Sequence, residues 1–333
     1  MSKKIMILTI ITAVISASLA GCGLFGQDVD PDISAMESQI LRLENEVELL
    51  RQQTVTHIVY KHKDDFLSGI DSPAFSEAVS AKQEAMDSLP ATIRIRDMEY
   101  STRLTSLTLN NMNLTDRDIE ELKYMVYLEE LQIYQNRITD LTPLKGLTNL
   151  KVLSLFNNQV SDLTPLAGLV NLESLYLRSN NITDISPLEG LLFLNSLDIS
   201  ENNIADISPL TNMAEMKVLR INDNRIVNLA GLINMKKLNR LHMQNNRITD
   251  ISAVAALNEI TEIYVDGNGV TSIEPLRSLT TLGWLKIGHN PLTDISPVGS
   301  LSRLRKLYIE GLYVDNETLE YIYEQLPNLD ITF

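Results

Sequence analysis

Two consecutive blocks of sequence decide the fold: LKVLSLFNNQVSDLTPLAGLVN at residues 150–171 and LESLYLRSNNITDISPLEGLLF at residues 172–193. Both blocks have the same 22-residue length, and apolar residues, an Asn, an Asp and a Thr/Ser-Pro-Leu triplet return at the same places in each. A repeat of about 20–50 residues predicts a solenoid, because one unit alone cannot bury its apolar side and must stack on its neighbours.

The 22-residue register extends well beyond these two blocks. An irregular and slightly longer coil, from Leu104 to Tyr127, precedes it and has Met112 where the repeats have Asn. We therefore expect ten stacked strands, which at about 4.8 Å per strand would extend for about 43 Å. The regular coils begin at Leu128, Leu150, Leu172, Leu194, Met216, Leu238, Ile260 and Leu282, and the next begins at Leu304.

Each coil reads approximately L-x-x-L-x-L-x-x-N-x-I-x-D-I-x-P-L-x-x-L-x-x. Alternating residues such as Leu131 and Ile133 are expected to face inward from a short strand, and successive strands to pair in parallel. The pattern is that of leucine-rich repeats, and its length and Ser/Thr-Pro-Leu close resemble the repeats of internalins and related bacterial surface proteins over roughly residues 70–333. The resemblance implies an α/β solenoid, a right-handed superhelix with a parallel sheet on its concave side and 3₁₀ turns on its convex side.

One Asn per coil follows the strand and forms a single column. Its amide can donate to and accept from buried turn backbone of neighbouring coils, so this ladder is interpreted as structural. The column consists of Asn136, Asn158, Asn180, Asn202, Asn224, Asn246, Asn268 and Asn290.

The opposite side of the coils carries Ser/Thr-Pro pairs and a column of Asp. The hydroxyl before Pro is expected to cap a short 3₁₀ turn, as at Thr142-Pro143, Thr164-Pro165, Ser186-Pro187, Ser208-Pro209 and Ser296-Pro297. One carboxylate per coil is too few for a calcium site, so the Asp column is interpreted as turn capping and no metal is expected. The column consists of Asp140, Asp162, Asp184, Asp206, Asp250 and Asp294.

A solenoid exposes its core at both ends and needs caps. Residues 56–103 are expected to form the N-terminal cap, with a helix opening at residues 70–79, and residues 104–303 the leucine-rich repeats. Residues 304–333 should hold the last repeat, with Leu312 in place of Asn, and a C-terminal cap with a helix from Asn316 to Gln325.

The N-terminal segment up to Cys22 has the layout of a bacterial lipoprotein signal. Lys3 and Lys4 precede an apolar run, and small residues lead to Cys22, so residues 1–21 are predicted to be a cleaved signal peptide. Leu19-Ala20-Gly21-Cys22 resembles the lipobox, which implies a diacylglyceryl anchor, with palmitate among its acyl chains, on Cys22. An ordinary signal peptide with a chance Cys is the alternative. The lipobox predicts secretion across the cytoplasmic membrane and a lipid-anchored protein on its extracytoplasmic face or the cell surface.

Residues 22–32 form a short lipidated tether, and residues 33–55 read as a helical stalk. Apolar residues recur there in steps of three and four, as in a coiled coil. The segment 33–53 therefore predicts either a weak homo-oligomer or a lone spacer helix, because helices this short are marginal alone. The seam consists of Ile33, Met36, Ile40, Leu43, Val47 and Leu50.

Composition excludes several classes of function. The formal net charge of −15 disfavours nucleic acid and electrostatic membrane docking. Among standard motifs there is no phosphate loop, no H-E-x-x-H, no G-x-S-x-G and no second Cys, so neither an enzyme nor a cofactor is expected. The four His residues, His57, His62, His242 and His289, are interpreted as solvent-facing or cap residues.

The outward strand residues are the candidate partner-binding site, because the fold constrains only their neighbours. Aromatic residues and Arg, which protein interfaces favour, gather there in a chain with only 6 Phe, 1 Trp and 11 Tyr. The resemblance to internalins implies an unidentified protein partner on this concave face; stacking on cell-wall glycan, or an inert envelope spacer, is the alternative. The predicted residues are Tyr134, Phe156, Tyr176, Arg178, Arg220, Arg240, His242, Tyr264, Trp284, Lys286 and Tyr308.

Overall fold

The computed structural model describes residues 89–333. The predicted signal peptide, Cys22, the tether, the stalk at residues 33–55 and the helix expected at residues 70–79 lie outside the described residues, as do His57 and His62. Within the described part, no helix has the length and apolar character needed to cross a membrane.

One parallel sheet of 11 strands runs through the molecule in the order of the chain, from β3 to β13. Each strand has only three residues, and its middle residue pairs with the equivalent residue of the next coil, as Leu131 does with Leu153. The strands are β3 (Ser106–Thr108), β4 (Glu130–Gln132), β5 (Val152–Ser154), β6 (Ser174–Tyr176), β7 (Ser196–Asp198), β8 (Val218–Arg220), β9 (Arg240–His242), β10 (Glu262–Tyr264), β11 (Trp284–Lys286), β12 (Lys306–Tyr308) and β13 (Asp330–Thr332).

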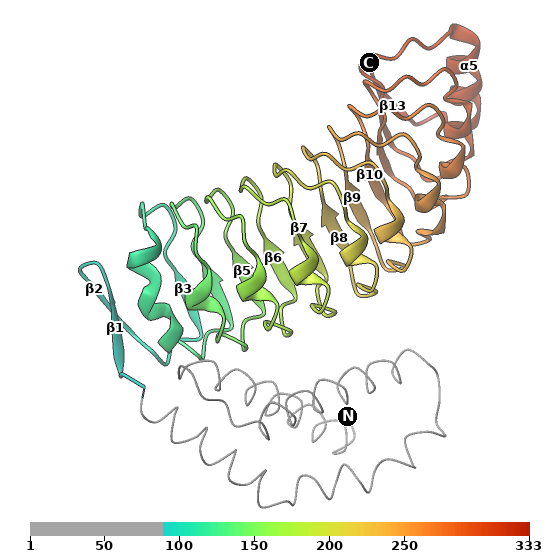
Figure 1. Cartoon of the computed structure of the whole chain (residues 1–333). Helices are drawn as coiled ribbons and strands as arrows, with labels where there is room; N and C mark the ends of the chain where they lie inside the picture. Colours follow the sequence, from blue (N-terminus) through green and yellow to red (C-terminus); the bar gives the residue numbers. More distant parts are fainter. Residues whose placement is uncertain (1–88) are drawn as a thin grey trace, which may run out of the picture.

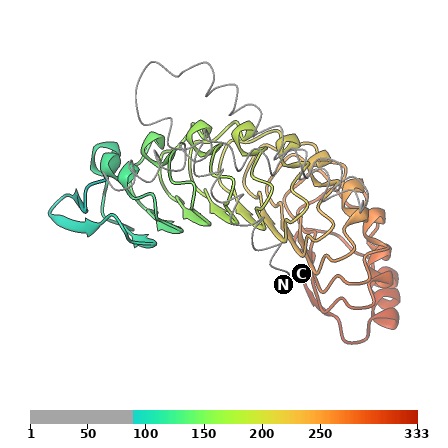
Figure 2. The same ribbon diagram turned by 90° about the horizontal axis from the view of Figure 1, so that it is seen from below.

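Short 3₁₀ helices return the chain on the opposite side of each coil. The stack of coils is an arc, with the sheet along its inner side and the short helices along its outer side (Figures 1 and 2). This is the solenoid that the 22-residue repeat predicts. The 3₁₀ helices of the repeats are Thr142–Leu144, Thr164–Leu166, Ser186–Leu188, Ser208–Leu210, Ala230–Leu232, Ser252–Ala256, Glu274–Leu276 and Ser296–Ser300.

The core between the sheet and the outer helices is aliphatic. Every hydrophobic residue buried in the described part is Leu, Ile, Val or Met, and most have no exposed surface at all. Equivalent residues of successive coils lie above one another, as Leu153 and Leu175 do, so each coil buries its apolar side on both neighbours. Burial of this kind contributes about 25 cal/mol per Å² of apolar surface, so the repeats hold together by packing.

The N-terminal end is closed by two elements that the repeat pattern does not predict. An antiparallel hairpin of β1 (Thr92–Ile95) and β2 (Met98–Ser101) buries Ile93 and Ile95 at the end of the core. Beside it, the irregular first coil contains a 3₁₀ helix, η2 (Asp116–Tyr124). Its start is fixed by a carboxylate, because the backbone N–H of Thr115 donates to Oδ2 of Asp118 at 2.7 Å.

At the C-terminal end the predicted helix is present as α5 (Asn316–Gln325), whose N-terminus is capped by Oδ1 of Asp315. The expectation of ten strands is wrong by one. After α5 the chain returns to the sheet as β13, and Ile331 pairs with Leu307 after a longer step than the repeats use. The helix lengthens this coil, so the last strand falls outside the 22-residue register.

Candidate functional site

The concave face consists of three outward side chains per coil. In β4 and just after it these are Glu130, Gln132 and Tyr134, whereas Leu131 and Ile133 between them are buried. Alternation along an extended backbone produces this arrangement, and parallel pairing aligns equivalent residues into columns. The first column is Glu130, Val152, Ser174, Ser196, Val218, Arg240, Glu262, Trp284 and Lys306. The second is Gln132, Ser154, Tyr176, Asp198, Arg220, His242, Tyr264, Lys286 and Tyr308. The third is Tyr134, Phe156, Arg178, Ser200, Asn222, Gln244, Asp266, Gly288 and Glu310.

Four members of the second column form one continuous stack toward the C-terminal end. The ring of His242 stacks on that of Tyr264 with centroids 4.4 Å apart and planes 13° apart. Next along the sheet, Nζ of Lys286 lies 4.8 Å from the ring centroid of Tyr264 and 4.5 Å from that of Tyr308. We call this set the aromatic–cation stack. Its members order one another without a partner, which lowers the entropy cost of binding.

Glu262, which is not among the concave residues predicted from the sequence, fixes the His242 end of this stack. Nε2 of His242 donates to Oε1 of Glu262 at 2.8 Å, and Nε of Arg240 lies 3.8 Å from Oε2. Burial alone would raise the pKa of Glu262, but hydrogen bonds from Tyr264 and His242 and the charge of Arg240 lower it. Glu262 is therefore the anion that holds this part of the face.

Two of the three partners of Glu262, His242 and Tyr264, stay neutral at pH 7. Burial lowers the pKa of His242 despite the nearby carboxylate, and burial together with the hydrogen bond to Glu262 raises the pKa of Tyr264. His242 faces outward as expected but is less exposed than a solvent-facing residue: its side chain is only 16% exposed, because Tyr264 covers one face of the ring. His289, by contrast, is exposed.

The N-terminal half of the face is arranged differently. The rings of Tyr134 and Phe156 stack with centroids 4.1 Å apart, and Tyr176 is half-buried further along. Nε of Arg178 donates to Oε1 of Glu201 at 2.9 Å. The predicted concave residues thus separate into two groups, one around the Tyr134–Phe156 pair and one around the aromatic–cation stack.

Two buried acceptors of the third column have no hydrogen-bond partner: Oδ1 of Asp266 and Oε1 of Gln244. Burial raises the pKa of Asp266, and its backbone hydrogen bond and the charges of Lys286 and His289 offset this only in part. Leaving a buried charge without a full set of donors costs free energy. Asp266 is therefore a local weakness of the solenoid.

We expect Asp266→Asn to raise the Tm at pH 7. Because folding raises the pKa of Asp266, its contribution to stability is fully present below the unfolded pKa and is lost as pH rises through the folded pKa. The advantage of the variant should therefore shrink as pH falls toward the ordinary Asp value of about 4. Thermal unfolding followed by circular dichroism at both pH values tests this, and a Tm advantage independent of pH would contradict it.

The Asn column binds successive coils together. In Asn158, Nδ2 donates to the carbonyls of Leu155 in its own coil and Ile133 in the preceding coil, both at 3.0 Å. Its Oδ1 accepts from the N–H of Ile138, also in the preceding coil, at 3.0 Å. The same bonds recur at Asn180, Asn202 and the later members of the ladder. These side chains are committed to the fold and are not available to a partner.

On the convex side the capping residue is Asp and not the hydroxyl before Pro. The backbone N–H of Thr142 donates to Oδ1 of Asp140 at 2.8 Å, and Thr142 is already the first residue of its 3₁₀ helix. At Ser186, Ser208 and Ser252 the hydroxyl also donates to the same carboxylate, at 2.9 Å for Ser186. The hydroxyl before Pro is therefore not the cap that the sequence predicted, whereas the Asp residues do cap the turns as expected.

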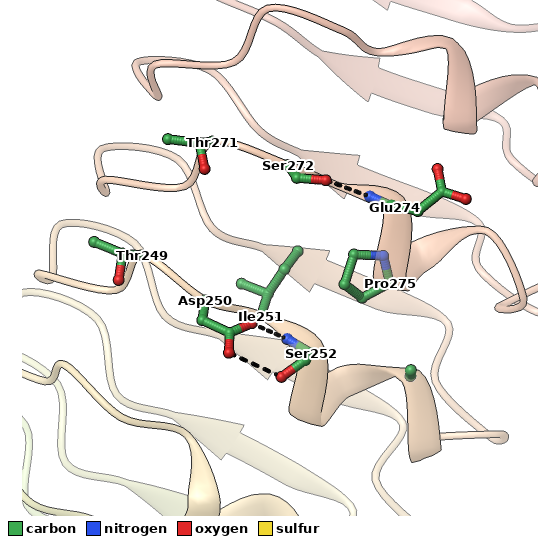
Figure 3. Close-up of a pocket in the computed structure, with 9 residues that line it drawn as sticks. Thr249, Asp250, Ile251, Ser252, Thr271, Ser272, Glu274 and Pro275 are labelled. Atoms are coloured by element: carbon green, nitrogen blue, oxygen red, sulfur yellow. Dashed lines mark hydrogen bonds between the residues drawn. The ribbon is translucent and has the colours of Figure 1, made fainter.

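An open groove of about 610 Å³ lies between two coils on these turns (Figure 3). Several of its polar groups are already engaged: Oδ1 of Asp250 accepts from the N–H of Ser252, and Oγ of Ser272 accepts from the N–H of Glu274. Across residues 89–333 no three His, Cys, Asp or Glu side chains come together as a metal site would require. The groove is therefore a weaker candidate than the concave face.

Comparison with known proteins identifies the class. The family model described as leucine-rich repeats in two copies matches residues 128–168, 170–212 and 214–256. No curated protein sequence matches the chain. Internalin C2 from Listeria monocytogenes has a solved structure with 33% identity and a TM-score of 0.53, and the match covers 59% of this chain and 85% of that one.

Two further solved structures are similar. The functional domain of InlJ from Listeria monocytogenes, described as including a cysteine ladder, is 25% identical with a TM-score of 0.55, and the match covers 70% of this chain and 54% of that one. The repeat ectodomain of the receptor kinase GASSHO1 from Arabidopsis thaliana, solved in complex with CASPARIAN STRIP INTEGRITY FACTOR 2, is 20% identical with a TM-score of 0.53, covering 64% and 30%. The plant likeness shows the fold alone.

The chain therefore belongs to the leucine-rich-repeat proteins. Within that class its repeat domain is internalin-like, with Asn in the ladder position throughout the regular coils and no Cys among residues 89–333.

Proposed function

We propose that this chain is a lipid-anchored extracytoplasmic protein that binds a protein partner through the concave face and is not an enzyme. The observation that carries the proposal is the aromatic–cation stack, which is ordered by its own contacts and lies beside the exposed residue Trp284. Aromatic and Arg side chains on a rigid surface are typical anchors of protein interfaces. The Cys22 anchor and the stalk at residues 33–53 remain part of the proposal, the stalk as a weak oligomerisation segment or spacer.

A neutral cell-wall glycan fits this face less well. Sugar rings stack on open aromatic faces, but His242 and Lys286 both lie against the ring of Tyr264. Tyr134 and Phe156 likewise cover one another. Each of these stacked rings therefore has at least one face covered, which leaves less open ring surface for a sugar and suits the mixed polar and apolar contacts of a protein partner.

The proposed function is tested by capture with the fragment 56–333, against surface proteins and, separately, purified wall glycan. We expect a protein to be retained by the wild-type fragment and by Lys145→Ala on the convex side, but not by Arg220→Glu on the concave face. Circular dichroism checks that each variant is folded. Retention of wall glycan instead, or equal capture by both variants, would contradict the proposal.

The anchor has a separate test. Because no other segment is expected to hold the chain on the membrane, we expect Cys22→Ser to abolish lipidation and move the protein from the detergent phase to the aqueous phase. Phase partitioning of whole-cell extracts, with Ser18→Ala as a control upstream of the lipobox, measures this. A Cys22→Ser variant that partitions like the wild type would refute the lipid anchor.

A further inference from the structure

The two halves of the concave face differ in how their cations are neutralised. In the N-terminal half, Nε of Arg178 bonds Glu201 at 2.9 Å. At the start of the strands there, Nζ of Lys151 lies 2.7 Å from Oε2 of Glu129. Both of these positive charges thus have a carboxylate of their own, and an acidic partner would gain little by approaching them.

The second column of the C-terminal half has cations that are not paired. Among the described residues, no carboxylate oxygen lies within 4.0 Å of Arg220 or Lys286. Asp198 is opposite Arg220 on the neighbouring strand, but its Oδ1 accepts from the backbone N–H of Ser200 at 3.1 Å. Lys286 lies between two rings of the aromatic–cation stack, which attract a cation without neutralising it, and Asp266 acts on it only from beyond ion-pair distance.

The first column of the same half is only loosely paired. Nε of Arg240 is 3.8 Å from Glu262, a carboxylate that His242 already engages at 2.8 Å. Nζ of Lys306 is 3.5 Å from Asp330, and both of these side chains are about half exposed. Exposed pairs at such distances contribute little, so these cations remain available to an incoming anion.

The charges of this half form stripes that run across the strands. Arg220, Arg240, Lys286 and Lys306 lie in the first and second columns of β8 to β12; we call them the cationic stripe. Within it, Glu262 of the first column is held by His242 and Arg240, and two further acids, Asp266 and Glu310, lie in the third column beside it. The face therefore orients an acidic ligand along the cationic stripe, because a shift toward the third column would bring like charges together.

We propose that the cationic stripe receives an acidic segment of the partner protein, lying along the solenoid axis across β8 to β12. This inference rests on the proposed function and adds the chemistry of the partner. Four strand spacings of about 4.8 Å make about 19 Å, which an extended peptide covers with about six residues. Trp284 lies in the first column between Glu262 and Lys306, so its exposed ring gives the segment an apolar contact within the stripe.

Trp284 also provides the test, because it is the only Trp of the chain. The full chain, purified in mild detergent, is titrated at low ionic strength with a hexaglutamate peptide that is acetylated and amidated. We expect saturable quenching or a shift of the Trp284 fluorescence, weakened by salt as screening requires. A hexalysine peptide of the same length should produce neither. A lack of response to hexaglutamate up to millimolar concentration would overturn the inference.

Charge reversal localises the effect. We expect Arg220→Glu and Lys306→Glu each to weaken hexaglutamate binding by about tenfold or more, since each replaces an attraction by a repulsion. Lys145→Glu carries the same change of charge on the convex side and should bind like the wild type. Circular dichroism confirms folding of all three. Equal affinities for the three variants would show that the peptide binds elsewhere and would overturn the proposal that it binds along the cationic stripe.

Two further outcomes distinguish failure of this inference from failure of the proposed function. Phosphatidylglycerol vesicles and soluble polyphosphate are tested in the same way. If either changes the Trp284 fluorescence more strongly than hexaglutamate does, the proposal of a polypeptide ligand is overturned. If hexaglutamate does not compete with a captured protein that binds the concave face, the proposed function stands, but the proposal that the partner binds through an acidic segment is refuted. Competition by hexaglutamate, lost in Arg220→Glu, supports both.

Discussion

Replacing Asn202 by Leu is expected to lower the free energy of unfolding by about 3 kcal/mol. Nδ2 of Asn202 donates to the carbonyls of Leu177, Ile199 and Ser200 at 3.0–3.1 Å, and its Oδ1 accepts from the N–H of Ile182 at 3.0 Å. Asn202 is only 8% exposed, so water cannot replace these bonds. Leu has a similar size but offers neither donor nor acceptor, and it would leave backbone groups of two coils unpaired.

Urea denaturation followed by circular dichroism measures the effect. The matched control is Asn181→Leu, the same substitution at an exposed Asn that directly follows the ladder residue Asn180. We expect the control to change stability by no more than about 0.5 kcal/mol. Equal denaturation midpoints for the two variants would show that the ladder does not hold the coils together.

The repeat register made much of this fold predictable. Once the coils are aligned on the repeat period, the inward Leu and Ile, the Asn column and the outward residues follow from the period of a strand. The same register contains a signal for interactions between coils. Opposite charges that stand one repeat apart face one another across adjacent coils, as Glu129 and Lys151 do at 2.7 Å and Glu215 and Lys237 do at 2.6 Å.

Glu262 shows what this signal can and cannot provide. Its place one repeat after Arg240 could have been found from the register, but its hydrogen bond to His242 crosses between columns and depends on rotamers. The low exposure of His242 has the same origin, since it follows from how the ring of Tyr264 lies on it. Such contacts are decided by packing of neighbouring side chains and leave no periodic pattern.

The ends of the solenoid escaped prediction for another reason. The hairpin of β1 and β2 and the last strand β13 stand outside the 22-residue register, and strands of three or four residues are too short for alternation to be recognised alone. The convex turns show a third limit. Asp140 and Thr142 are both good capping residues, and only the geometry shows that the carboxylate accepts from the backbone N–H of Thr142.

The second large effect is expected at Trp284. We expect Trp284→Ala to weaken binding of the protein partner by about 2 kcal/mol, or about thirtyfold, because a large ring with few rotatable bonds buries much area at little entropic cost. Trp284 is 40% exposed and its ring is not part of the aromatic–cation stack, so its removal should leave the fold of the face unchanged.

Tyr264 provides the informative comparison with Trp284. Tyr264 stacks on His242, contacts Lys286 and bonds Glu262, so Tyr264→Ala should lower both affinity and Tm, whereas Trp284→Ala should lower affinity alone. Surface plasmon resonance on the captured partner, with thermal unfolding of each variant, separates the two effects, and Lys145→Ala on the convex side should change neither. If Trp284→Ala binds like the wild type while a convex variant loses affinity, the partner does not use the concave face, and the aromatic–cation stack is then a feature of stability and not of recognition.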